Sequence, residues 1–247
     1  MSSSIWTRCA GASEIRPLRL MPWRAVEAQH QLSTRKLVDT RAEQELLETL
    51  IDRVKPPAVP SRQHFLLTTP FRYPPLRHGS RFGTRHERGI WYGSETRETA
   101  FAEVAYYRMV FLEGTRADLG TVTCELSAFR ASAGTKRGVD LSMKPFARHR
   151  AAIASPVSYT ETQALGSAMR AAGVELIRYP SARDAAGINV AAFSPAVFGR
   201  AKPKDFETWH CTAARTSVEM VRHLAREAHV FPRELFLVDG RLPAPAL

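Results

Sequence analysis

The sequence has few cysteines and no long apolar segment. Its 247 residues include three cysteines, Cys9, Cys124 and Cys211, and an odd number at wide spacing predicts neither a disulfide framework nor a zinc site. No apolar run approaches the ~18–20 residues of a membrane helix. The stretch from Met1 to Leu20 lacks the apolar core and cleavage site of a secretory signal. We therefore expect a protein of the reducing cytoplasm that does not enter a membrane.

Several widespread catalytic signatures are also missing. There is no G-x-x-x-x-G-K-[ST] phosphate loop, no G-x-G-x-x-G dinucleotide loop and no H-E-x-x-H zinc helix. No G-x-S-x-G elbow surrounds Ser181, so this serine is a poor candidate for a hydrolase nucleophile. The chain contains no internal repeat and no low-complexity segment. These absences argue against P-loop, dinucleotide-fold and zinc-protease chemistry.

The chain is strongly basic. It carries 35 Lys and Arg against 24 Asp and Glu, a formal net charge of +11. Such a balance indicates an anionic partner, which can be a nucleic acid, a phosphorylated small molecule or an acidic protein. The hydrophobic fraction of 44% and the length suffice for a folded domain with a sizeable core.

The pattern of apolar residues mixes helices and strands without a regular βαβ rhythm, which predicts an α+β fold. We expect helices at about 40–55, 96–111 and 161–172. The residues up to 38 read as irregular, and 61–89 read as long loops and short strands. The segment 205–230 is ambiguous. Strands are expected at about 89–93, 119–129, 174–179, 188–193 and 233–239.

The first expected helix has clear signals at both ends. Thr40 and Glu43 have the spacing of a capping box, in which each side chain accepts a hydrogen bond from the backbone of the other residue. An apolar stripe that includes Leu46 and Leu50 follows. Prolines at 56, 57 and 60 end the helix.

Glu103 is the most informative single residue. On the helix expected at 96–111 it shares one side with Ala100, Val104 and Tyr107. A carboxylate on an inward face loses hydration, which is costly unless the charge is paired. Two interpretations stay open at this point: a structural ion pair at the helix edge, or a carboxylate that serves a site.

Arginine and aromatic residues are interleaved in the stretch 61–89, before this helix. Guanidinium groups bind phosphate through two hydrogen bonds and stack on aromatic rings. The stretch therefore suits a nucleotide, a single-stranded nucleic acid or a solvated basic face. Its arginines are Arg62, Arg72, Arg77, Arg81, Arg85 and Arg88.

A third feature is the loop at 180–187, which is rich in small residues. Small side chains let a ligand approach the backbone closely, and Ser181 adds a hydroxyl group. An ordinary hairpin loop is the alternative interpretation.

Taken together, these segments resemble the RES domain. The motifs are G-S-R-F-G at 79–83, G-I-W-Y-G-S at 89–94, E-T-A-F-A-E at 98–103 and Y-P-S-A-R at 179–183, followed by G-I-N at 187–189. Their order and spacing agree with the family across distant segments, which is more specific than any one motif.

The resemblance implies roles for individual side chains. Glu103 would hold the ribose hydroxyls and stabilise positive charge, Arg81 would clamp a pyrophosphate, and Ser181 would orient a ribose or the acceptor. Gly83 stands where many members carry Asn, which removes an amide from that position. The catalytic residues implied are Arg81, Glu103 and Ser181, and the substrate-binding residues are Tyr92, Arg72, Tyr73 and Asn189.

The resemblance also implies a fold and an activity. The fold would be a compact α+β domain with a mixed sheet and a central cleft, similar to the ADP-ribosyltransferase toxins. One domain would cover 1–247, with a motif-bearing core at about 70–195 and an N-terminal extension, 1–60, packed on it. The activity would break the nicotinamide–ribose bond of NAD+, which is a substrate here, and no metal or cofactor is expected.

The acceptor and the partners follow from the same resemblance. Phosphate (a phosphorylase) or water (a glycohydrolase) would take the ADP-ribose, and the toxin would pair with a Xre-type antitoxin. Nucleic acid would be reached only through that antitoxin. Two alternatives stay open: an ADP-ribosyltransferase that modifies a protein target, and a basic nucleic-acid-binding module without enzymatic activity, whose binding would fall steeply with salt.

Overall fold

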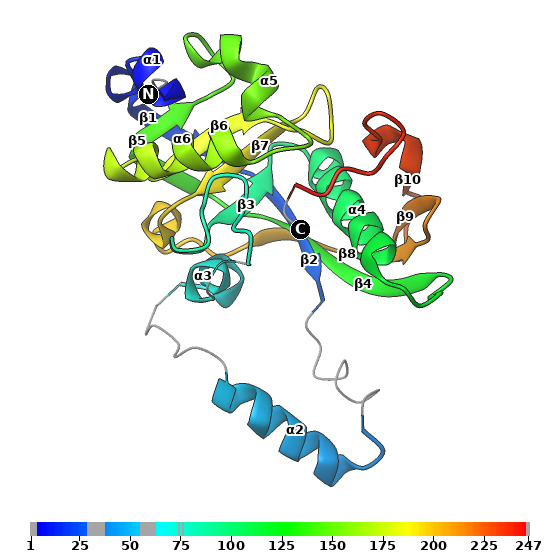
Figure 1. Cartoon of the computed structure of the whole chain (residues 1–247). Coiled ribbons are helices and arrows are strands. Elements are labelled where there is room, and N and C mark those ends of the chain that lie inside the picture. Colours follow the sequence, from blue (N-terminus) through cyan, green and yellow to red (C-terminus); the bar gives the residue numbers. More distant parts are fainter. Residues whose placement is uncertain (1–3, 29–37, 55–62, 74, 76, 246–247) are drawn as a thin grey trace.

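The computed structural model describes residues 4–28, 38–54, 63–73, 75 and 77–245. Its centre is a 10-stranded sheet with the strand order β1-β5-β6-β7-β3-β2-β4-β8-β9-β10 (Figure 1). β5 and β6 pair in parallel, and the other neighbouring strands pair antiparallel. The mixed sheet and its helices confirm the predicted α+β class. The strands are β1 (Arg16–Leu20), β2 (Trp23–Glu27), β3 (Trp91–Ser94), β4 (Val122–Arg130), β5 (Ala133–Asp140), β6 (Leu176–Pro180), β7 (Ile188–Ala192), β8 (Lys204–Ala213), β9 (Ser217–Arg222) and β10 (Ala228–Pro232).

Helices and short 3-10 turns complete the described chain. The expected helices at 96–111 and 161–172 are confirmed as α4 and α6. The α-helices are α1 (Ile5–Arg8), α2 (Arg41–Val54), α3 (Phe65–Arg72), α4 (Arg97–Gly114), α5 (Arg150–Ile153) and α6 (Thr160–Ala171), and the 3-10 turns are η1 (Gly11–Glu14), η3 (Phe146–His149), η4 (Pro195–Phe198) and η5 (Arg233–Phe236).

The N-terminal residues are not irregular, so that prediction was wrong. They form α1, η1, β1 and β2, and β2 lies inside the sheet between β3 and β4. The two strands have only five residues each, with Pro17 inside β1 and Pro22 just before β2, so they carry little periodic signal. Their pairing partners, such as Ala128 opposite Ala25, are distant in the sequence and cannot be read from local pattern.

Two other local predictions were wrong. The segment 61–89 contains the helix α3 rather than only loops and short strands, and Pro70 is part of that helix. No strand forms at 233–239: the 3-10 turn η5 occupies its first residues, and an isolated bridge from Val238 to Arg241 follows. The ambiguous segment forms three strands, β8, β9 and β10.

Helix α2 confirms its predicted capping box. The backbone N–H of Glu43 donates to the Thr40 hydroxyl at 3.2 Å, and the backbone N–H of Thr40 donates to the Glu43 carboxylate at 3.0 Å. The prolines at 56, 57 and 60 lie outside the described residues. The apolar stripe faces solvent, because Leu46 and Leu50 are exposed and α2 lies apart from the sheet (Figure 1).

Two apolar clusters share one face of the sheet. On one half, Leu165 and Met169 of α6 pack against Ile177 of β6 and its neighbours. On the other half, Phe101 of α4 packs with Trp209 of β8 in the second cluster. Because different clusters lie beneath them, α4 and α6 cover different halves of the same face, and a space is left between the helices.

A third apolar cluster covers the opposite face. It contains Leu67 of α3 together with Trp91, Val190 and Leu176 from the sheet. Successive side chains of a strand point to opposite faces. Trp91 therefore points away from the face that its neighbour Tyr92 serves, and α3 lies behind the sheet relative to α4 and α6.

Two of the three cysteines are neighbours on adjacent strands of the sheet. Cys124 on β4 is directly opposite Cys211 on β8, and both are free thiols. The neighbouring Cys211 thiol lowers the pKa of Cys124. The wide spacing in the sequence thus gives no hint of this pair.

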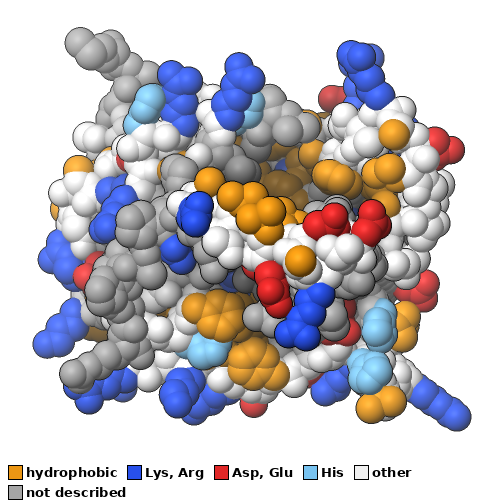
Figure 2. Space-filling view, turned by 90° about the horizontal axis from the view of Figure 1, so that it is seen from below, with side chains coloured by type: hydrophobic (Ala, Val, Ile, Leu, Met, Phe, Trp, Pro, Cys, Tyr) orange, Lys and Arg blue, Asp and Glu red, His pale blue; other side chains and the backbone are white. Residues whose placement is uncertain are grey.

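No helix in the described part of the chain is long and apolar enough to cross a membrane. Lys and Arg side chains are spread around the outline of the face seen in Figure 2, with Asp and Glu among them. On that face the charge forms no continuous basic stripe.

Candidate active site

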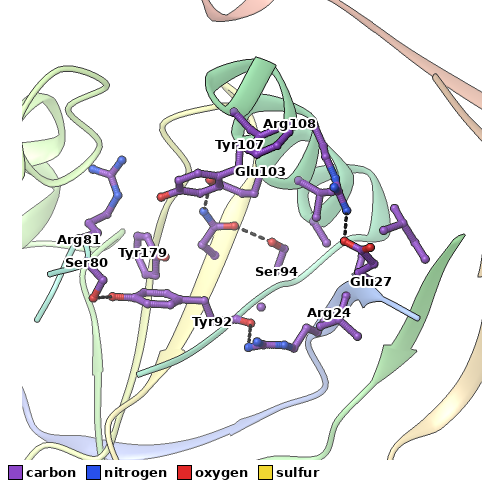
Figure 3. A pocket seen from close by; sticks show the side chains of 18 of the residues that line it. Arg24, Glu27, Ser80, Arg81, Tyr92, Ser94, Glu103, Tyr107, Arg108 and Tyr179 are labelled. Carbon is purple, nitrogen blue, oxygen red and sulfur yellow. Dashed lines mark hydrogen bonds and ion pairs between the residues drawn. The ribbon is translucent and has the colours of Figure 1, made fainter. Parts of the chain in front are cut away.

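A cavity of about 490 Å³ lies between α4 and the loop before α6. This volume is within the roughly 300–1,000 Å³ typical of small-molecule sites. The predicted inward side of α4 lines it with Ala100, Glu103, Val104 and Tyr107. Figure 3 shows the polar side chains that converge on it from α4, β2, β3 and β6.

Two buried side chains from distant segments hold the Glu103 carboxylate. The hydroxyl group of Ser181 donates to Oε1 at 2.8 Å, and the amide Nδ2 of Asn189 donates to the same oxygen at 2.6 Å. Each donor is only 3% exposed. The other oxygen, Oε2, has no hydrogen-bond partner among the described residues, so it is free to face a ligand.

The orientation of Asn189 is fixed by a further hydrogen bond. The hydroxyl group of Ser94 donates to its Oδ1 at 2.6 Å, which leaves Nδ2 to point at Glu103. Ser94 and Asn189 face each other across β3 and β7. A chain of hydrogen bonds therefore runs from the sheet to the helix and fixes the carboxylate.

The hydroxyl group of Ser181 is fully occupied. Besides donating to Glu103, it accepts hydrogen bonds from the backbone N–H groups of Arg183 at 3.0 Å and Asp184 at 3.2 Å. A hydroxyl group has one proton and two lone pairs, so its capacity is used up. This arrangement suits a residue that positions Glu103 and does not suit a nucleophile.

The first turn of α4 is tied directly to the loop that carries Ser181. Thr99, which is fully buried, donates from its hydroxyl group to the Asp184 carboxylate at 2.6 Å. Thr96 caps the helix by accepting from the backbone N–H of Thr99 at 3.2 Å. These contacts set the distance between Glu103 and Ser181.

Arg81 is buried at one end of the cavity. Its Nη1 donates to the backbone carbonyl groups of Ile153 at 3.2 Å and Ser155 at 2.9 Å, and its guanidinium lies 4.7 Å from the centre of the Tyr159 ring. No carboxylate pairs with it among the described residues. A buried guanidinium held by carbonyls and an aromatic ring is placed to bind an anion.

Tyr92 forms the floor next to Arg81. Its hydroxyl group accepts from the backbone N–H of Phe82 at 3.2 Å and lies 2.9 Å from the Ser80 hydroxyl. Burial raises the pKa of Tyr92 to about 12. The ring is therefore a neutral, fixed surface at physiological pH.

Two tyrosines join α4 to the loop before α6. The hydroxyl groups of Tyr107 and Tyr159 lie 3.1 Å apart, and burial raises the pKa of Tyr107 well above its usual value. Tyr107 is nevertheless 49% exposed, and Phe111, one turn further along α4, is 57% exposed. Both line the cavity, so aromatic surface is accessible at its edge.

Strand β2 supplies a wall that sequence reasoning missed. Arg24 donates from Nη1 to the Tyr92 backbone carbonyl at 2.8 Å, and Glu27 pairs with Arg108 of α4 at 2.7 Å. Ser94 was missed as well, although it lies two residues after Tyr92 and so points to the same face. For Arg24 and Glu27 the sequence offers no local signal, because their segment reads as irregular.

The structure does not bring every predicted site residue into the cavity. Ser181 does not line the cavity but donates a hydrogen bond to Glu103, which does. The predicted residues that line the cavity are Arg81, Tyr92, Glu103 and Asn189. Arg72 and Tyr73 lie at the end of α3, where the Arg72 guanidinium is 5.8 Å from the centre of the Tyr73 ring. Neither is among the lining residues, because α3 packs against the other face of the sheet.

The described residues contain no group of three or more His, Cys, Asp or Glu side chains placed to hold a metal ion. The polar side chains that line the cavity are carboxylates, guanidinium groups, hydroxyl groups and the amide of Asn189.

Comparisons with known proteins identify a matching family and a similar fold. The family described as the RES domain matches residues 50–214. Among solved structures, a chain of the crystal structure of the M. tuberculosis MbcT-MbcA toxin-antitoxin complex is similar in fold, with a TM-score of 0.50 and 12% sequence identity. The match covers 83% of this chain and 91% of that chain. No curated protein matches the sequence significantly.

Proposed function

Because the chain belongs to the RES domain family, we propose that it is a cytoplasmic toxin that degrades NAD+ by cleaving the nicotinamide–ribose bond. Inorganic phosphate is the acceptor that we favour, which makes the protein an NAD+ phosphorylase, and water is the second acceptor. The observation that carries the proposal is the Glu103 carboxylate, whose Oε1 is held by Ser181 and Asn189 while Oε2 stays free in the cavity.

The reaction places demands that these residues meet. When the bond between ribose C1′ and the nicotinamide nitrogen breaks, its electron pair goes to the ring and neutral nicotinamide leaves. Positive charge builds on the ribose, as in other glycosyl transfers. A fixed carboxylate next to C1′ stabilises this charge without reorganising, and Glu103 is fixed by two buried donors.

The acceptor completes the step. An oxygen of phosphate or water bonds to C1′, and for a monoprotonated phosphate or water the proton leaves to solvent or to a base. Glu103 can accept ribose hydroxyl hydrogen bonds at Oε2, which would hold the sugar at its carboxylate. Ser181 has no free lone pair for attack on C1′. We therefore assign to it the positioning of Glu103.

The remaining lining residues suit the rest of the dinucleotide. Arg81, which lacks a carboxylate partner in the described chain, would bind a pyrophosphate oxygen with the donors not used by Ile153 and Ser155. The ring of Tyr92 would pack against the nicotinamide. The amide of Asn189 joins Ser94 to Glu103, so we assign to it the positioning of the carboxylate.

The test is NAD+ consumption by the purified full chain, with and without inorganic phosphate. A phosphorylase consumes NAD+ faster with phosphate and releases nicotinamide and phosphorylated ADP-ribose. A glycohydrolase releases free ADP-ribose at a rate that phosphate does not change. Transfer of labelled ADP-ribose to a protein would favour the transferase alternative, and salt-sensitive binding of nucleic acid without any loss of NAD+ would contradict the proposal.

We also propose that an antitoxin protein covers the cavity. The similar structure comes from a toxin-antitoxin complex, and here the exposed aromatic residues Tyr107 and Phe111 stand at the edge of the cavity. Exposed aromatic side chains are frequent anchors of protein interfaces. Co-purification with a small Xre-type partner that stops NAD+ consumption would support this; a partner that binds without inhibiting would contradict it.

A further inference from the structure

Arg24 lies at the other end of the cavity from Arg81. It is the second residue of β2, which pairs with β3 through Trp23 and Ser94. Just beyond this pair the Arg24 side chain reaches β3, where Nη1 donates to the Tyr92 carbonyl at 2.8 Å. The guanidinium stacks 5.1 Å from the centre of the Trp91 ring. Its position is thus fixed by a hydrogen bond and an aromatic ring.

This guanidinium has no acidic partner among the described residues. The nearby carboxylate of Glu27 is paired with Arg108 at 2.7 Å. The Nε atom of Arg24 is buried and has no hydrogen-bond partner in the described chain. Burial lowers the pKa of Arg24 to about 10, so the group still carries its charge near neutral pH. A charge in such a place is costly unless a counter-charge arrives.

Arg24 and Arg81 serve separate parts of the cavity. Tyr92 lies between them: its hydroxyl group is held on the Arg81 side by Phe82 and Ser80, and its backbone carbonyl is held by Arg24 (Figure 3). The cavity is therefore lined by two guanidinium groups without carboxylate partners in the described chain, Arg81 on the side of the Tyr92 hydroxyl group and Arg24 at the Tyr92 backbone carbonyl.

We infer that Arg24 is a second anion-binding residue of this cavity and that it binds a phosphate group. That phosphate comes either from inorganic phosphate, as the acceptor, or from the dinucleotide itself. Naming these two sources rests on the proposed function, because it assumes that the protein cleaves NAD+. The inference that Arg24 binds phosphate does not depend on that function. Arg24 lies outside residues 50–214, the part of the chain matched by the family, so the family match does not assign it.

The experiment compares Arg24→Gln with Arg41→Gln in the full chain. Arg41 lies on the exposed helix α2, and its replacement removes the same charge far from the cavity. Isothermal titration with inorganic phosphate measures binding directly. We expect Arg24→Gln to weaken phosphate binding at least about tenfold, since a charge-assisted hydrogen bond is lost, and Arg41→Gln to bind like the wild type.

Steady-state kinetics then separates the two sources. A rise in the KM for phosphate at constant KM for NAD+ identifies the acceptor, and a rise in the KM for NAD+ identifies a phosphate of the dinucleotide. Arg24→Lys keeps the charge, so it should bind phosphate more tightly than Arg24→Gln does. A purely structural role of Arg24 would not predict this difference. The inference is overturned if folded Arg24→Gln binds phosphate like the wild type and both KM values are unchanged.

A lack of turnover would not obscure the result. If the wild type consumes no NAD+, the proposed function fails, and the titration still decides whether Arg24 binds phosphate. If Arg24→Gln does not fold, Arg24→Lys is compared with the wild type. Phosphate binding by both proteins supports a site that depends on the charge of residue 24. A wild type that binds no phosphate contradicts the inference.

Discussion

Asn189 donates a 2.6 Å hydrogen bond to the Glu103 carboxylate, although the two residues are 86 positions apart. The donor stands on β7 and the acceptor on α4, so the contact exists only after the sheet and the helix have packed. The position of this carboxylate is therefore a property of the whole fold. The predictions that follow concern the consequences for catalysis and stability.

Replacing Glu103 by Gln should lower kcat for NAD+ cleavage by at least about a hundredfold, as expected when a preorganised electrostatic contact to the transition state is removed. The amide oxygen can still accept from Ser181 and Asn189, so the fold should be retained. Nicotinamide release measures the rate, and circular dichroism checks the fold. Wild-type turnover by the folded variant would remove Glu103 from the mechanism.

Replacing Arg81 by Ala should raise the KM for NAD+ by about ten- to a hundredfold, because a charged hydrogen bond is worth about 1.5–3 kcal/mol. The matched control is Arg137→Ala. Arg137 is exposed and its Nε donates to the Gly173 carbonyl at 2.6 Å, away from the cavity. Equal effects of the two variants would indicate a diffuse basic field and no clamp.

Replacing Ser181 by Ala should reduce kcat about tenfold and leave measurable activity, because the hydroxyl group positions Glu103. The variant also leaves two backbone N–H groups without their acceptor, which costs about 1–3 kcal/mol in the free energy of unfolding. Urea denaturation measures the stability, with the exposed Ser13→Ala as control. Loss of activity as complete as that of Glu103→Gln would argue for a direct chemical role.

Replacing Gly166 by Ala tests the packing of α6. Alanine normally stabilises a helix by about 1 kcal/mol relative to glycine. At Gly166, however, a Cβ atom would lie 1.9 Å from the carbonyl oxygen of Phe82, next to Arg81. We expect a loss of at least about 1–3 kcal/mol in the free energy of unfolding and weaker NAD+ binding.

The control for this variant is Gly114→Ala at the end of α4. A Cβ atom there meets no other atom within 4 Å, so we expect no loss of stability. Thermal unfolding of both variants gives the comparison. Equal melting temperatures would mean that the loop at Phe82 moves away easily.

The stability of the fold should fall at alkaline pH because of Tyr92. Burial raises the pKa of Tyr92 to about 12 in the folded protein from 10.0. Between these values the unfolded chain loses the proton and the folded chain keeps it. The contribution to stability is therefore complete below pH 10 and is lost as the pH rises toward about 12.

Denaturation of Tyr92→Phe against pH isolates this effect from the other buried tyrosines. The variant cannot ionise at this position, so its stability should fall less steeply with pH than that of the wild type. Identical slopes would show that Tyr92 ionises in the folded protein as it does in water.

Local signals in the sequence were sufficient for the elements that carry the motifs. The shared side of Ala100, Glu103 and Tyr107 predicted how α4 presents its face, and these residues line the cavity. The capping box at Thr40 likewise fixed the start of α2. In each case the signal lies within one or two helical turns.

The parts that were missed depend on contacts between distant residues. Arg24 and Glu27 belong to a five-residue strand without clear alternation, whose pairing with β4 joins segments about a hundred positions apart. The helix α3, with Pro70 inside it, forms where the sequence predicted only loops and short strands. Arg72 and Tyr73 show the converse: a plausible motif lies on the far face of the sheet, because local sequence does not reveal which face a helix will cover.

The insertion of β2 between β3 and β4 has a consequence for assembly. β1 lies at the edge of the sheet and β2 in its middle, and β2 is enclosed only when it pairs with Ser94 on one side and with Leu126 to Arg130 on the other. A fragment trimmed to residues 50–214 would keep all the motifs and leave a gap in the centre of the sheet. The wall of the cavity that β2 supplies therefore forms only after segments far apart in the sequence have paired.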